Sequence, residues 1–86
     1  MKTLLIILIT LFANISYSND YFNALELFNK RKINESVKLF QNVANDKKNP
    51  KRSDAMYNLA IIFDNGFGVS PDKTRALFYY KSASEL

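Results

Sequence analysis

Residues 55–84, AMYNLAIIFDNGFGVSPDKTRALFYYKSAS, decide how this chain folds. They hold both glycines of the chain, Gly66 and Gly68, between two segments whose apolar residues recur at helical spacing. Pro71 and Asp72 follow directly. Glycine commonly ends a helix, and proline or a short polar residue commonly begins the next one. The stretch therefore predicts two helices joined by a turn, with the glycines bending the chain as it leaves the first helix.

The same spacing continues through the rest of the chain beyond residue 18, and no window alternates as a strand would. The four apolar stripes are Tyr21, Ala24, Leu25 and Phe28; Ile33, Val37, Phe40 and Ala44; Ala55 or Met56, Leu59, Ala60 and Phe63; and Ala76, Tyr79, Tyr80 and Ala83. We expect Asn34 to cap the second helix, and Asn49 followed by Pro50 to open the third. Ser70 or Asp72 should cap the fourth. The sequence predicts an all-α chain of four helices.

The N-terminus has the pattern of a secretory signal peptide. Lys2 is followed by an almost unbroken apolar run, residues 4–13, and then by the small residues Ser16 and Ser18. An uncleaved anchor is the alternative, but a spanning helix needs about 20 apolar residues, and Asn14 interrupts the run. We expect cleavage after Ser18 and a periplasmic or secreted protein that meets the membrane only transiently, through the signal peptide.

Composition excludes several kinds of chemistry. The 86 residues contain no cysteine and no histidine, so the usual metal ligands and nucleophile–base pairs are missing. The carboxylates are spread over separate predicted helices and turns, with no close pair for acid–base catalysis. Without Lys2 the net charge falls from +4 to +3. We expect no metal, no cofactor and no enzymatic activity.

The two halves of the chain beyond residue 18 resemble each other. Phe28 aligns with Phe63 at an offset of 35 residues, whereas Phe40 aligns with Tyr79 at an offset of 39. The halves are therefore the same helix pair, with four extra residues in the turn of the second. Such internal similarity is typical of α-helical repeat proteins.

Residues 55–84 resemble one repeat of the Sel-one-like family, a relative of tetratricopeptide repeats. The matching positions are Ala55, Leu59, Ala60, Phe63, Gly66, Gly68, Val69, Asp72, Ala76, Tyr79, Tyr80 and Ala83. Departures from the family pattern are mild, such as Ala60 for glycine and Phe63 for tyrosine. The resemblance implies two stacked antiparallel helix pairs, with a divergent tetratricopeptide-like pair over residues 19–48 and a Sel-one-like repeat over residues 49–86.

The resemblance also implies a function: Sel-one-like proteins act as adaptors that bind other proteins or peptides. We expect an exported protein-interaction module whose partner is a protein or peptide, or a second copy of the chain, and not nucleic acid. The first helix of each pair would line the binding groove, which gives the candidates Asn23, Leu27, Tyr57, Asn58, Ile61 and Asp64.

Two other interpretations stay open. One exported, cysteine-rich Sel-one-like group is described as penicillin-binding or weakly β-lactam-hydrolysing, but its members carry a cysteine pair in each repeat and this chain has none. The other is a truncated repeat array without function of its own.

Two motifs within residues 63–80 imitate catalytic ones. Gly66-Phe67-Gly68 lacks the third glycine and the preceding strand of a dinucleotide fingerprint. Ser70 and Lys73 have the S-x-x-K spacing of penicillin-recognising enzymes, yet their companion motifs are missing. We interpret both as parts of a turn and a helix start, with Val69 returning to the core.

Two surface features point to partners. Basic residues cluster at 30–32 and at 47–52, where charge either serves solvation or contacts an acidic partner or an anionic membrane. The aromatic residues are too numerous for four helices to enclose, so either they pack back on the core or Phe78 or Tyr57 joins an interface.

Overall fold

The computed structural model describes residues 19–86, which form four helices and contain no strand. The helices are residues 19–29, α2 (Ile33–Asn45), α3 (Arg52–Asn65) and α4 (Lys73–Ser84). The predicted all-α fold is confirmed. The predicted signal peptide, residues 1–18, lies outside the described residues. In the described part of the chain, every helix is too short or too polar to cross a bilayer.

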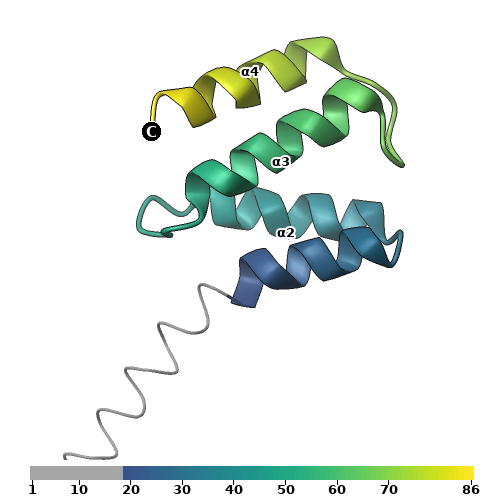
Figure 1. Ribbon diagram of the computed structural model, residues 1–86, viewed down its shortest axis with the longest axis horizontal. Helices are drawn as coiled ribbons and strands as arrows, with labels where there is room; N and C mark the ends of the chain where they lie inside the picture. The colour runs from purple at the N-terminus through teal and green to yellow at the C-terminus, as the bar shows by residue number, and fades with distance from the viewer. Residues whose placement is uncertain (1–18) are drawn as a thin grey trace, which may run out of the picture.

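The helices stack in chain order, from the 19–29 helix at the bottom of Figure 1 to α4 at the top. Successive helices run in opposite directions, because each connecting turn reverses the chain. α3 packs against α2 on one side and against α4 on the other. The predicted stack of antiparallel helix pairs is therefore confirmed, and within residues 19–86 α4 is the last layer of the stack.

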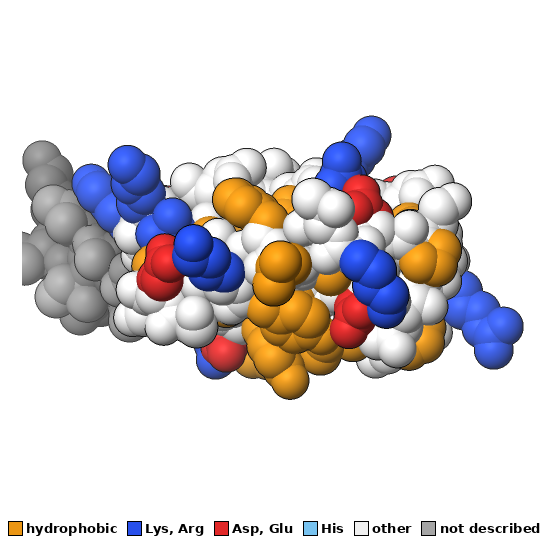
Figure 2. Space-filling model, turned by 90° about the horizontal axis from the view of Figure 1, so that it is seen from above, with side chains coloured by type: hydrophobic (Ala, Val, Ile, Leu, Met, Phe, Trp, Pro, Cys, Tyr) orange, Lys and Arg blue, Asp and Glu red, His pale blue; other side chains and the backbone are white. Residues whose placement is uncertain are grey.

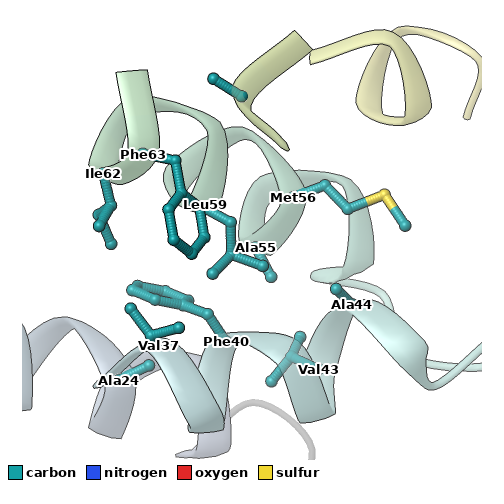
Figure 3. Packing of buried hydrophobic residues seen from close by; sticks show 11 residues of the cluster. Ala24, Val37, Phe40, Val43, Ala44, Ala55, Met56, Leu59, Ile62 and Phe63 are labelled. Carbon is teal, nitrogen blue, oxygen red and sulfur yellow. The ribbon is translucent and has the colours of Figure 1, made fainter. Parts of the chain in front are cut away.

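The hydrophobic core lies mainly between α2 and α3. Phe40 of α2 points toward Leu59 and Phe63 of α3 (Figure 3). Phe40 is 1% exposed, and burying such a side chain stabilises the fold by about 2–3 kcal/mol. The buried hydrophobic residues are Ala24, Val37, Phe40, Val43, Ala44, Ala55, Met56, Leu59, Ala60, Ile62, Phe63 and Ala76. They include at least one residue of each predicted stripe, so helical periodicity located the core correctly.

Two small residues bring the 19–29 helix close to α2. Ala24 and Ser36 are both fully buried, and the Ser36 hydroxyl donates a hydrogen bond to the Ala24 carbonyl oxygen at 2.7 Å. The hydroxyl is the only polar group of the Ser36 side chain. Because it is hydrogen-bonded, burying Ser36 leaves no polar group unpaired. Ser36 was not predicted as a core residue, since its hydroxyl reads as polar in sequence.

The turn between α3 and α4 has the geometry that its glycines predict. Gly66 ends α3 in the left-handed conformation, with φ +70°, and its N–H donates to the Ile62 carbonyl. Gly68 has φ +71°, and an added Cβ there would collide with the Ile33 side chain of α2. Glycine is required at both positions for conformation, and at Gly68 also for the close approach of α2.

Of the two residues predicted to cap α4, Ser70 and Asp72, the structure confirms Asp72. The Asp72 carboxylate accepts a hydrogen bond from the Arg75 N–H at 2.9 Å and so caps the helix. The Asp72 N–H in turn donates to the Phe63 carbonyl at 2.8 Å, which ties the turn to α3. Ser70 is exposed and does not cap. Val69 packs against the core, as predicted.

Two predicted caps are wrong. Asn34 lies inside α2, because the chain bends so tightly after residue 29 that the helix already begins at Ile33, with Lys32 preceding it and no side-chain cap. Pro50 is not the first residue of α3, which begins at Arg52. Asn49 instead closes a turn ahead of the helix, where its side-chain oxygen accepts from the Lys51 N–H at 2.9 Å.

Candidate protein-interaction surface

α4 is apolar on more sides than its neighbour α3 can cover. Ala76 is buried, and Tyr79, Tyr80 and Ala83 pack partly against the core. Leu77 and Phe78 occupy the same helix but are 69% and 62% exposed. Because residues 76–80 are all apolar, the middle of α4 presents apolar side chains in more directions than one neighbouring helix can bury. Figure 2 looks down on α4 and shows hydrophobic side chains gathered at the middle of this face, with charged groups around them.

Phe78 also lines a groove between α4 and α2, which we name the α2–α4 groove. It consists of adjoining hollows of about 620, 520 and 400 Å³. The first two share Gln41, Asp72 and Arg75, and the last two share Phe78 and Tyr79. The groove therefore follows α4 along most of its length, bounded by α2 on the other side.

Aromatic and cationic groups form the floor of this groove. The Arg75 guanidinium lies 4.9 Å from the centre of the Phe63 ring, and Tyr79 stacks on the same ring at 6.1 Å. Phe78 meets Tyr79 edge to face, with ring centres 5.3 Å apart. Such contacts hold the rings in fixed orientations. The exposed Phe78 is thus presented from a rigid base.

The structure separates the six groove candidates from the α2–α4 groove. They lie on the 19–29 helix and on α3, and none lines the groove. Asn23 is exposed, Leu27 and Ile61 are half-buried, and Tyr57 is 54% exposed. Tyr57 lines a separate hollow of about 320 Å³ together with Tyr80, whose ring centre is 5.8 Å away.

Two of the six candidates make contacts within the chain. The Asn58 side-chain amide donates to the Tyr21 hydroxyl at 2.9 Å and so joins α3 to the 19–29 helix. Asp64 joins α3 to α4: one carboxylate oxygen accepts from the Lys73 amine at 2.6 Å and the other from the Tyr80 hydroxyl at 3.3 Å. These contacts give both side chains a structural role at their helix junctions.

The Asp64 cluster shifts the acidity of its members. The hydrogen bond from Lys73 lowers the pKa of Asp64 below its ordinary value, with a further lowering from the charge of Lys73. Desolvation and the neighbouring Asp64 carboxylate raise the pKa of Tyr80. The Lys73 amine is held by Asp64 and by the Asp64 carbonyl at 2.8 Å. In this arrangement the Lys73 amine ties the start of α4 to α3.

Sequence reasoning named Phe78 and Tyr57 as alternatives for an interface but did not name Leu77. Leu77 falls outside the predicted apolar stripe, and the sequence alone does not show whether another element covers such a residue. Among residues 19–86 there is also no group of three or more carboxylates placed to hold a metal ion.

The stacked helix pairs define an α-helical repeat protein. Residues 53–86 match the family model of the Sel1 repeat. The matched range covers α3 from Ser53 onward, the glycine turn and α4, so the match supports the resemblance over the second helix pair. Sel1 repeats are typically non-catalytic modules that mediate protein–protein interactions. Neither curated proteins nor solved structures give a significant match to the chain.

Proposed function

We propose that the chain is an exported, non-catalytic module that binds another protein through the outer face of α4 and the adjoining α2–α4 groove. The observation that carries the proposal is the exposure of Leu77 and Phe78, both above 60%, on the last helix of the stack. In a repeat stack, each helix pair buries one face against the next pair. Within residues 19–86 no further helix covers α4, so a helix of another protein can take that place.

The groove suits a partner helix with a narrow apolar stripe. Its floor combines aromatic rings with the Arg75 guanidinium, and polar and charged groups of α2, among them Lys38 and Gln41, line its other side. Binding of an amphipathic helix in a hydrophobic groove is a common mode of recognition, with anchors three or four residues apart. Phe78 lies where such an anchor would contact this chain.

Site-specific photocrosslinking in the cell that makes the protein tests this proposal. A photoreactive phenylalanine analogue replaces Leu77, and a matched variant carries it at Lys47 in the turn between α2 and α3. The proposal expects a discrete adduct with one protein from position 77 and none from position 47. It also expects Phe78→Glu to abolish the adduct at 77. A folded chain without an adduct at 77, or with adducts of equal yield at both positions, would contradict the proposal.

The second candidate surface is the exposed side of the first helices, with Asn23, Leu27, Tyr57 and Ile61. The hollow beside Tyr57 and Tyr80 favours it. The same analogue at Asn23 distinguishes the two surfaces, since it lies on the 19–29 helix, away from the α2–α4 groove. Adducts from position 23 in place of position 77 would assign binding to the first helices.

A further inference from the structure

A separate pocket lies where the two helix pairs meet at the turn ends of their helices. Its volume is about 600 Å³, and its lining comes from the end of the 19–29 helix, the start of α2 and the glycine turn: Phe28, Asn29, Arg31, Ile33, Phe67 and Gly68. Phe28 and Phe67 meet edge to face, with ring centres 6.2 Å apart. Phe67 is 46% exposed. The pocket therefore has an apolar floor that is open to solvent, and its volume is within the range of ligand pockets.

Three consecutive basic residues, Lys30, Arg31 and Lys32, form the turn at the rim of this pocket, and all three are exposed. The Lys30 amine pairs with Glu26 at 2.9 Å. Within the described part of the chain, Arg31 and Lys32 form no ion pair. An apolar pocket thus borders two cationic side chains without an acidic partner, which gives the site a clear charge preference.

The backbone at Arg31 adds a second observation. Arg31 has φ +62°, the only positive φ of a non-glycine residue in residues 19–86. The Lys32 N–H donates to the Leu27 carbonyl at 2.9 Å, and the Phe67 N–H donates to the Ile62 carbonyl at 3.1 Å in the same way. Both helices thus end with a left-handed residue enclosed by the same five-residue hydrogen bond, with Arg31 where the second pair has Gly66.

Glycine is the preferred residue at this position, because a Cβ is unfavourable in the left-handed conformation. The first pair instead places a long cation there, beside the pocket. A side chain that the backbone disfavours is a recurrent feature of binding sites. Replacing Arg31 by glycine should therefore remove the cation from the pocket and leave the turn folded.

We propose that this pocket binds an acidic peptide segment that carries one aromatic or large aliphatic residue. The apolar side chain contacts Phe28, Ile33 and Phe67, while flanking carboxylates pair with Arg31 and Lys32. Arginine suits such pairing because its planar guanidinium can hold a carboxylate through two hydrogen bonds. The pocket shares no lining residue with the α2–α4 groove, so this proposal stands apart from the function proposed above.

The charge count favours a peptide over a membrane. Recognition of anionic lipid surfaces typically uses clusters of about four to eight basic residues. The turn offers three, one of them paired with Glu26, and Glu35 follows in the first turn of α2. A pocket beside two cations that form no ion pair within residues 19–86 matches a short acidic segment better than an extended anionic surface.

Fluorescence anisotropy of a labelled probe tests the proposal on the full-length chain fused to a soluble carrier, with the carrier alone as blank. The probe is an acetylated heptapeptide of Asp and Glu with a central Phe; its partner probe has Ala in place of Phe. The variants are Arg31→Gly, Lys32→Gln and the double change. The control, Lys47→Gln with Lys48→Gln, removes two exposed cations from the other basic turn.

We expect the Phe probe to bind more tightly than the Ala probe, and the binding to weaken as salt is raised. Each single variant should raise the Kd about three- to fivefold and the double variant about tenfold, since each removes one ion pair. The control should leave the Kd unchanged. Equal effects of control and pocket variants would overturn the proposal, as would equal affinity for both probes. Association of the chain with phosphatidylserine vesicles but not with the Phe probe would overturn it in favour of a membrane.

Discussion

At the scale of single residues, the glycine turn holds two positions where only glycine fits without strain. Gly68 combines a left-handed backbone with close approach to Ile33 of α2. Gly66 has a similar backbone, and a Cβ there would lie 2.5 Å from the Pro71 ring. The turn therefore links α4 not only to α3 but also to the first helix pair.

Gly68→Ala should lower the free energy of unfolding by about 1–3 kcal/mol, because alanine is strained at this φ and displaces Ile33. Urea unfolding followed by circular dichroism measures the loss. Ser70→Ala, an exposed change in the same turn, is the matched control and should stay within about 0.5 kcal/mol of the parent. Identical midpoints for Gly68→Ala and the parent would contradict the proposed tight approach.

Arg31→Gly should leave the free energy of unfolding unchanged or raise it by up to about 1 kcal/mol, since glycine removes the Cβ that the left-handed conformation disfavours. The same urea titration measures it. A clear loss of stability would mean that the Arg31 side chain supports the fold itself.

Asp64 makes part of the stability depend on pH. Its pKa is lowered in the folded chain by the Lys73 hydrogen bond, so its contribution is present above the unfolded pKa of about 3.8 and is lost as pH falls through the folded value. Asp64→Asn should therefore flatten the acid side of the stability profile, measured by urea midpoints between pH 2 and 7. Lys73→Gln should have the same effect without adding to it. A profile parallel to that of the parent would exclude this role.

The sequence identifies residues that can cap a helix, but it does not determine which of them does so. Asp72 was one of two predicted caps and is the one that binds the Arg75 N–H. Asn34 has equal capping propensity but lies inside α2, because the backbone bonds of the preceding turn already fix where the helix starts. Propensity identifies residues able to cap, whereas the geometry of the incoming chain selects among them.

At the scale of elements, α4 combines a buried and an exposed apolar side. Leu77→Lys should change the free energy of unfolding by no more than about 0.5 kcal/mol, since the side chain is 69% exposed. The neighbouring change Ala76→Asp should cost more than about 2 kcal/mol, because Ala76 is 1% exposed and the charge would be buried without a partner. Urea unfolding of both variants provides the comparison.

Comparable losses from the two variants would mean that Leu77 is covered in solution. That result would contradict an open α4 face in the isolated chain and would indicate self-association through it.

Periodicity predicted the core-facing side of every helix but not the outer side of α4. Ala76, Tyr79, Tyr80 and Ala83 form one stripe, and the structure places all four toward the core. Whether Leu77 and Phe78 are exposed depends on what packs against α4 from outside, and no local pattern carries that information. Ser36 was not predicted as a core residue, since its burial depends on a hydrogen bond to a carbonyl in another helix.

At the scale of the whole molecule, the internal repeat predicted from sequence is visible in the turns. The first pair is joined by residues 30–32 and the second by residues 66–72, which accounts for the four extra residues expected in the second half. Both first helices end with a backbone hydrogen bond that spans five residues, from Lys32 to Leu27 and from Phe67 to Ile62. The pocket at their junction could not be predicted from sequence. Phe28 and Phe67 belong to different helix pairs, and their rings meet only because the two pairs pack against each other.

The stack underlies the proposed function: we propose that the outer face of α4, which residues 19–86 leave open, is covered by another protein in the working state. Hydroxyl-radical footprinting of Phe78, compared between the purified chain and the chain in its native surroundings, tests this most directly. We expect strong oxidation of Phe78 in the purified chain and clear protection in the native setting, with Phe40, which is 1% exposed, protected in both. Equal oxidation of Phe78 in the two settings, or protection already in the purified chain, would contradict it.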